Sequence, residues 1–85
     1  MNSTAIEVLI YSRTGCHLCE MAEEVLEQLH SEVEFSHSKV LIDGDKELEY
    51  QYGEQVPVIT INGKVHDFFR LDPNRFKAAI KELRR

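Results

Sequence analysis

The 85-residue chain lacks the features of disulfide-rich secreted domains, of membrane-spanning proteins and of multi-domain proteins. It has two cysteines, whereas a secreted domain of this size usually has four or more in a disulfide framework. No stretch approaches the roughly 18 consecutive apolar residues of a membrane span, and no basic segment precedes the first apolar run, as a signal peptide requires. The chain is also too short for two ordinary cores. We expect one domain over residues 1–85, located in the cytoplasm and without membrane contact.

Positive charge is scarce as well. Ten Lys and Arg face fifteen Asp and Glu, which gives a formal net charge of −5. Such a chain repels phosphate backbones, and no basic and aromatic patch offsets that repulsion. We therefore expect no nucleic-acid partner. What is present, 42% hydrophobic and 29% charged residues, is typical of a globular domain.

Apolar patterning predicts the first three elements. Residues 5–11 are nearly all apolar and rich in β-branched side chains, which predicts a strand buried on both faces. Apolar residues then recur at helical spacing and predict an amphipathic helix. The core side of this helix is expected to consist of Leu18, Met21, Ala22, Val25 and Leu29. Residues 33–42 predict a second strand, whose alternation changes phase, so its limits or a bulge stay open.

Cap residues mark two further helices. Asp45 is suited to be the N-cap of a short helix, and Gly53 is suited to end it. Asp72 followed by Pro73 predicts the start of a last helix, since proline is favoured at the first helical position. The buried stripe of the last helix is expected to be Phe76, Ala79, Ile80 and Leu83.

Between these helices the sequence predicts a β-hairpin. Asn62-Gly63 favours a type I′ turn, in which both central residues need positive φ, and residues 56–61 and 64–69 flank it. The first strand, helix and second strand form a crossover, which makes those strands parallel, while the hairpin adds two antiparallel strands. We expect an α/β fold of order β-α-β-α-β-β-α, with a four-stranded mixed sheet and helices on both faces.

The two cysteines are three residues apart in SRTGCHLCEMAEE, residues 12–24, at the start of the first predicted helix. They could exchange disulfides, hold a metal or staple the fold, although a bridge over so short a loop removes little entropy from the unfolded chain. The free N–H groups of a helix N-terminus stabilise a thiolate and lower the pKa of Cys16. Cys19 lies one turn deeper on the same side, from which it can attack a mixed disulfide formed by Cys16.

The chain is similar to glutaredoxin-like proteins of the thioredoxin fold. Three features carry the resemblance: a buried first strand, YSRTGCHLC at the opening of the first helix, and QVP before the third strand. The resemblance covers nearly the whole chain. It implies a thiol–disulfide oxidoreductase in which Cys16 is the nucleophile and Cys19 the resolving thiol. It also implies that the Val56-Pro57 bond is cis, that Pro57 faces the active cysteine, and that the neighbouring backbone pairs with an extended substrate.

The residues between the cysteines differ from the family pattern. His17 could stabilise the Cys16 thiolate when its ring is protonated, and the alternative is an exposed polar residue with a weak effect. Leu18 departs from the proline and tyrosine usual between glutaredoxin cysteines. The redox potential therefore does not transfer from the family, and we assign both residues to the predicted substrate-binding set.

The glutathione seat of glutaredoxins is missing from the sequence. The family uses a glycine pair followed by an aspartate at the start of the last helix, and this chain has FFRLD, residues 68–72. Arg13 and Arg70 could pair with the carboxylates of glutathione or of a peptide, or could be solvated arginines. We expect a monomer that acts on disulfide-containing proteins without a bound cofactor. Glutathione stays a candidate partner, and glutathione or a protein reductase is the expected electron donor.

Two other function classes stay open. Cys16 and Cys19 could hold zinc, copper or a bridging iron–sulfur cluster, but two cysteines fall short of four ligands, so a dimer or outside thiols would be needed. A protein-interaction module could instead use the edge at Val56 and Pro57 while its cysteines are incidental. Metal content separates the first alternative from the enzyme, and loss of partner binding in Cys16→Ser separates the second.

Overall fold

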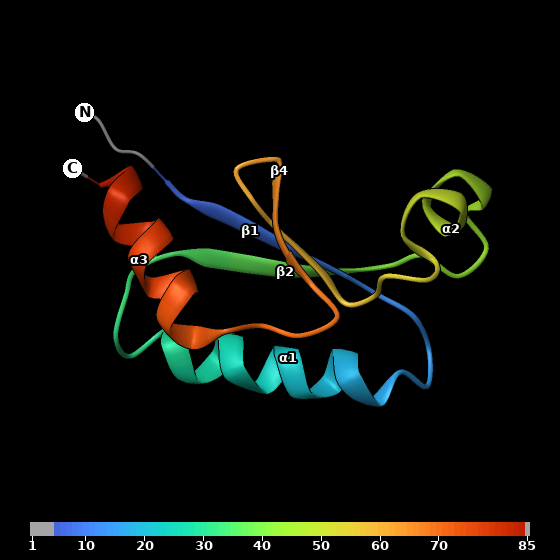
Figure 1. The fold of residues 1–85 in the computed structure, drawn as a ribbon, viewed down its shortest axis with the longest axis horizontal. Coiled ribbons are helices and arrows are strands. Elements are labelled where there is room, and N and C mark those ends of the chain that lie inside the picture. Colours follow the sequence, from blue (N-terminus) through green and yellow to red (C-terminus); the bar gives the residue numbers. More distant parts are fainter. Residues whose placement is uncertain (1–4, 85) are drawn as a thin grey trace.

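The computed structural model describes residues 5–84 and has the predicted order of elements (Figure 1). In chain order these are β1 (Glu7–Ser12), α1 (His17–Leu29), β2 (Ser36–Leu41), α2 (Lys46–Tyr52), β3 (Val58–Ile61), β4 (Lys64–Phe68) and α3 (Pro73–Leu83). None of the helices in residues 5–84 is long and apolar enough to cross a membrane. The expectation about a signal peptide falls partly on residues 1–4, which lie outside the described residues.

The four strands form one mixed sheet in the order β2-β1-β3-β4. β1 runs parallel to β2 and antiparallel to β3, and β3 pairs with β4 in the predicted hairpin. Asn62 and Gly63 have φ values of 50° and 87°, the positive signs that a type I′ turn requires. The register of the hairpin shifts between Ile59 and Thr60, an irregularity that the sequence did not predict.

β2 is shorter and more regular than predicted. It spans Ser36–Leu41 where the sequence suggested 33–42, and its register with β1 shows no shift. Phe35 and Ile42, whose apolar side chains suggested the longer strand, are 8% and 0% exposed and lie just beyond its two ends. Because β2 is an edge strand, most of its own side chains are exposed, and the expected alternation is weak.

Helices lie on both faces of the sheet, but unequally. α1 and α3 cover one face, and apolar residues from β1, β3 and both helices form a single buried cluster there. Its members that are 0% exposed are Ile10, Leu26, Ile59, Phe76 and Ile80. α2 lies at the carboxyl end of β1, where the ring centroids of Tyr52 and Tyr11 are 4.6 Å apart (Figure 1). Since Tyr11 alternates with Ile10, this contact is on the opposite face.

The core side of α1 differs from the predicted one. Its buried residues are Cys19, Ala22, Leu26 and Leu29. Leu18 and Met21, which the sequence assigned to the core, are 48% and 50% exposed. The apolar stripe of this helix is therefore wider than the sheet covers, and one flank of it faces solvent. In α3 the prediction is confirmed for Phe76 and Ile80 and wrong for Leu83, which is 47% exposed in the last turn.

Candidate functional site

The loop between β1 and α1 places Cys16 at the start of the helix. The Cys16 N–H donates to the carbonyl oxygen of Arg13 over 3.2 Å, and Gly15 has φ of 77°, a conformation that favours glycine. The Thr14 N–H donates to Oδ1 of Asp43 over 3.0 Å, which ties the loop to the turn after β2. One local and one long-range hydrogen bond therefore fix the entry of the chain into α1.

The two cysteines have different environments. Cys16 is the N-cap of α1, and its Sγ accepts a hydrogen bond from the Cys19 N–H over 3.1 Å. The pair is joined as a disulfide with the Cα atoms 5.2 Å apart. Cys16 is partly exposed, whereas Cys19 is only 2% exposed. A thiolate at Cys16 would accept the same N–H bond and feel the positive end of the helix, which are the conditions that stabilise it.

The Val56-Pro57 peptide bond is cis, as the resemblance implied. Pro57 is fully buried and Val56 is half-buried just before β3. The Phe69 N–H donates to the carbonyl oxygen of Pro57 over 2.9 Å and to that of Gln55 over 3.2 Å. The segment after β4 is thus bonded to the proline loop, while the pairing of a substrate with Val56 stays a prediction.

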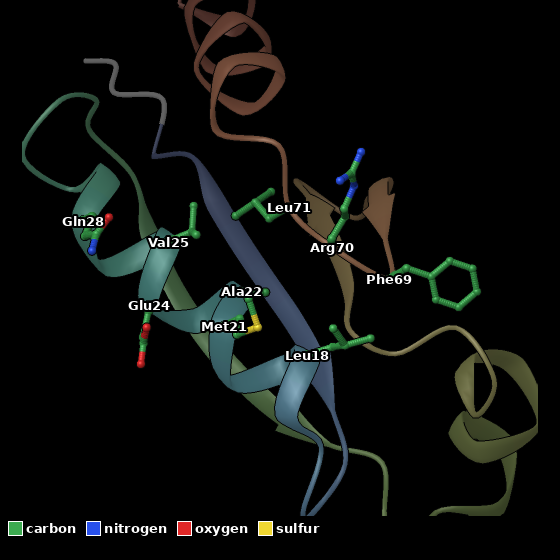
Figure 2. Close-up of a pocket in the computed structure, with 9 residues that line it drawn as sticks. All are labelled: Leu18, Met21, Ala22, Glu24, Val25, Gln28, Phe69, Arg70 and Leu71. Atoms are coloured by element: carbon green, nitrogen blue, oxygen red, sulfur yellow. The ribbon is translucent and has the colours of Figure 1, made fainter.

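A groove runs along the exposed flank of α1, beginning at the residue beside Cys19 (Figure 2). We call it the apolar groove; its volume is about 300 Å³. Its lining residues are Leu18, Met21, Ala22, Glu24, Val25, Gln28, Phe69, Arg70 and Leu71. Figure 2 shows Leu71 pointing toward α1, while Phe69 and Arg70 extend outward from the segment between β4 and α3. The groove thus joins two of the predicted substrate-binding residues, Leu18 and Arg70.

A second hollow, of about 210 Å³, lies on the β2 side of the cysteine pair. We call it the cysteine hollow. Its lining residues are Ser12, Arg13, Thr14, Gly15, Cys16, Cys19, Glu20, Glu23, Lys39 and Leu41. Nζ of Lys39 and Oε2 of Glu23 are 3.4 Å apart across it. Of the predicted site residues, this hollow brings Arg13 together with both cysteines.

His17 is an exposed residue between the two cysteines. Its side chain is 82% exposed, and its Nδ1 lies 4.0 Å from Oε1 of Glu20. This placement fits the alternative interpretation of an exposed polar residue. The remaining residues of the apolar groove, among them Met21, Val25 and Phe69, were missed as site residues. Helical spacing did reveal Met21 and Val25, but it assigned them to the core.

The side chain of the N-cap residue of α3 bonds N–H groups in the first turn of that helix. Oδ1 of Asp72 accepts the N–H groups of Asn74 and Arg75 over 2.9 and 3.2 Å, which confirms the predicted N-cap. Phe69 has φ of 71°, unusual for a residue with a side chain. The N–H groups of Phe69, Asn74 and Arg75 therefore already have acceptors.

Three histidines lie away from the cysteines. His30 Nε2 and His37 Nδ1 are 2.8 Å apart, and this contact joins the end of α1 to β2. Burial, and then the neighbouring His30, lower the pKa of His37. Burial, and then the charge of Arg75, lower the pKa of His66 on β4.

Within residues 5–84, no three or more His, Cys, Asp or Glu side chains gather as a metal site would require.

The chain was compared with protein families and with solved structures, and both comparisons match glutaredoxin-like or thioredoxin-like proteins. The family described as Glutaredoxin-like domain (DUF836) matches residues 7–81. The solved structure of protein Ne2328 from Nitrosomonas europaea is 30% identical, with a TM-score of 0.80, over 94% of this chain and 99% of that one. Protein XcR50 from X. campestris is 32% identical, with a TM-score of 0.75, over 88% of this chain and 96% of that one. A thioredoxin of Malassezia sympodialis is 26% identical, with a TM-score of 0.58, over 91% and 73% of the two chains.

Proposed function

The chain belongs to the glutaredoxin-like domain family (DUF836) and has a thioredoxin-like fold with a C-x-x-C pair, and from that premise we propose that it is a dithiol oxidoreductase. Cys16 is the nucleophile and Cys19 the resolving thiol. The observation that carries the proposal is the asymmetry of the pair. Cys16 caps the helix and is partly exposed, whereas Cys19 is buried one turn deeper and within bonding reach of it.

The reaction has two exchange steps. The Cys16 thiolate attacks one sulfur of the substrate disulfide, a mixed disulfide forms, and the other substrate sulfur leaves as a thiolate. Cys19 then attacks Cys16, the internal disulfide forms, and the second substrate sulfur leaves. The substrate gains two electrons and the cysteine pair loses them. An external dithiol reductase, or two glutathione molecules, returns the pair to the reduced form.

The surroundings of the pair favour protein disulfides over glutathione as substrates. The apolar groove begins beside the cysteines, and its exposed side chains Leu18, Met21 and Phe69 suit apolar side chains that flank a substrate cysteine. The capped start of α3 and the bonded Phe69 N–H leave little backbone for the γ-glutamyl end of glutathione. Arg70 at the rim of the groove and Arg13 in the cysteine hollow are the proposed contacts for substrate carboxylates.

Reduction of insulin by dithiothreitol, followed as turbidity, tests this proposal. The wild-type protein is expected to accelerate the reaction, and Cys16→Ser to abolish the acceleration because the attacking sulfur is missing. Cys19→Ser is expected to retain covalent capture of substrate but lose turnover, which a gel without reductant shows as a mixed disulfide. Equal activity of Cys16→Ser and the wild type would refute the assignment of the nucleophile.

A further inference from the structure

One wall of the apolar groove is a short segment that belongs to no helix or strand. Residues 69–71 connect β4 to α3, and all three line the groove. We call them the groove wall. Leu71 is 7% exposed and points toward α1, whereas Phe69 is 48% exposed and extends outward (Figure 2). Because Phe69 has few buried contacts, the position of the wall depends on polar interactions at its two ends.

The carboxylate of Asp67 on β4 bonds to the chain on both sides of the groove wall. Its Oδ1 accepts the Phe68 N–H over 3.1 Å, just before the wall, and its Oδ2 accepts the Asp72 N–H over 3.4 Å, just after it. Nη1 of Arg75, in the first turn of α3, lies 3.2 Å from the same Oδ2. Nη2 of Arg75 donates to the carbonyl oxygen of His66 over 3.5 Å. One carboxylate and one guanidinium therefore hold both ends of the wall.

The carboxylate of this ion pair is shielded from solvent. The Asp67 side chain is 17% exposed and the Arg75 side chain is 58% exposed. Loss of a shielded acceptor leaves its donors without a partner, which costs more than loss of an exposed one. A second ion pair of α3 offers a contrast. Nζ of Lys77 and Oε1 of Glu32 are 2.7 Å apart, the Glu32 side chain is 51% exposed, and neither residue lines the groove.

The groove wall is also bonded to the proline loop. The Phe69 N–H donates to the carbonyl oxygens of Pro57 and Gln55, and Phe69 has φ of 71°. Positive φ is unfavourable for a residue with a side chain and persists only where neighbouring interactions hold it. The Asp67 carboxylate and the two carbonyl oxygens supply those interactions. A displaced wall would therefore alter the groove and the segment beside Pro57 together.

From these contacts we propose that Asp67 and Arg75 are positioning residues that give the enzyme its preference for protein disulfides, a proposal that rests on the proposed function. Asp67 holds the wall against which a substrate chain packs, and Arg75 holds the Asp67 carboxylate. Neither residue lines the apolar groove or the cysteine hollow, so neither takes part in the attack of Cys16. A small disulfide that reaches Cys16 without using the wall should not depend on the ion pair.

Two disulfides of different size test this proposal. The reduced protein is mixed with insulin or with dithiobisnitrobenzoate, and acid quenching with mass spectrometry gives the rate constant for its oxidation by each. Asp67→Asn places an amide where the Asp72 N–H and Arg75 need an acceptor. It is expected to lower the insulin rate constant by about fivefold or more and to keep the dithiobisnitrobenzoate rate constant within about twofold of the wild type. Arg75→Gln should act in the same way, and Arg75→Lys, which keeps the charge, should restore part of the insulin rate.

Glu32→Gln is the matched control, because it breaks the exposed ion pair with Lys77 on the same helix and should leave both rate constants at the wild-type values. An unchanged insulin rate in folded Asp67→Asn and Arg75→Gln would overturn the proposal. Equal slowing of both disulfides, or the same loss in Glu32→Gln, would overturn it too. A wild-type protein that does not reduce insulin would instead overturn the proposed function, so the two failures are distinguishable. Circular dichroism of each variant verifies that it is folded.

Discussion

The sulfur of Cys16 occupies the position where a serine or aspartate side chain usually caps a helix. It accepts the Cys19 N–H over 3.1 Å at the positive end of α1. A sulfur in this position gains most from being charged, and that gain is available to Cys16 but not to the buried Cys19. The backbone N–H groups at the start of α1 therefore distinguish the two thiols.

We expect the pKa of the Cys16 thiol to lie clearly below the value of about 8.5 for free cysteine. Thiolate absorbance titration of Cys19→Ser, which keeps Cys16 alone, measures it. Cys16→Ser, which keeps Cys19 alone, is the comparison and should titrate at or above the free value. A Cys16 that titrates near 8.5 would remove the basis for calling it the nucleophile.

Residues whose role depends on their immediate neighbours in the chain were predictable. Asn62-Gly63 forms the expected turn and Asp72 caps α3, since both need only local backbone geometry. The ion pair of Glu23 with Lys39 was not predictable, because β2, which is distant in sequence, brings Lys39 across the cysteine hollow.

At the scale of elements, α1 serves two purposes with one apolar stripe. Leu26 is fully buried against the sheet, whereas Leu18 is 48% exposed in the apolar groove. Helical periodicity locates the stripe but does not fix how the helix is rotated about its axis on the sheet. That rotation depends on packing against β1, β3 and α3, which are distant in sequence. The same dependence explains why the exposed edge strand β2 was predicted too long.

A pair of leucine substitutions on α1 tests this rotation. Leu26→Ala is expected to lower the free energy of unfolding by about 2–5 kcal/mol, because it leaves a cavity in the core. Leu18→Ala removes the same atoms from an exposed position and should cost less than about 1 kcal/mol. Urea unfolding of both variants measures the difference. Similar losses would show that Leu18 belongs to the core, as the periodicity alone suggested.

The partial burial of His37, and then its contact with His30, make the junction of α1 with β2 sensitive to acid. The pKa of His37 is lowered in the folded state, as is that of His66, so between these values and about 6.5 the unfolded chain binds more protons. The stabilisation is complete above about pH 6.5 and is lost as the pH falls through that value toward the folded pKa. The free energy of unfolding should therefore decrease from about pH 7.5 to about pH 5.5.

His37→Gln is expected to reduce that pH dependence, since it removes one of the two groups. His17→Gln is the control, because the His17 side chain is 82% exposed and it should keep the wild-type slope. Urea unfolding at several pH values gives both slopes. A slope unchanged by His37→Gln would show that other groups cause the loss of stability in acid.

For the whole molecule, the overall topology followed from the sequence because seven elements and short connections leave few arrangements of one mixed sheet. The surface around the cysteines did not follow. The apolar groove forms only because the segment after β4 comes back to α1. This approach makes Phe69 and Leu71 lining residues of the groove. No spacing in the sequence places Phe69 in one groove with Met21.

This surface leads us to expect that protein disulfides are better substrates than glutathione mixed disulfides. Phe68, Phe69 and Arg70 carry side chains where the resemblance to glutaredoxins predicts bare glycine backbone, and Asp72 accepts an N–H group at the start of α3. A glutathione-coupled assay with a small mixed disulfide, run beside insulin reduction by the same protein, compares the two. Fast turnover of the first with little of the second would contradict this expectation and would favour Arg13 and Arg70 as a glutathione seat.

The central claim is that Cys16 and Cys19 act together as a reversible dithiol. Equilibration of the purified protein in a series of glutathione buffers, with mass spectrometry of the quenched samples and elemental analysis of the same preparation, tests it most directly. The account predicts a reversible loss of two hydrogens per chain at a defined potential, and no stoichiometric metal. A pair that cannot be oxidised internally, or zinc or iron bound at a fixed ratio to the chain, would contradict it and favour a metal-binding module.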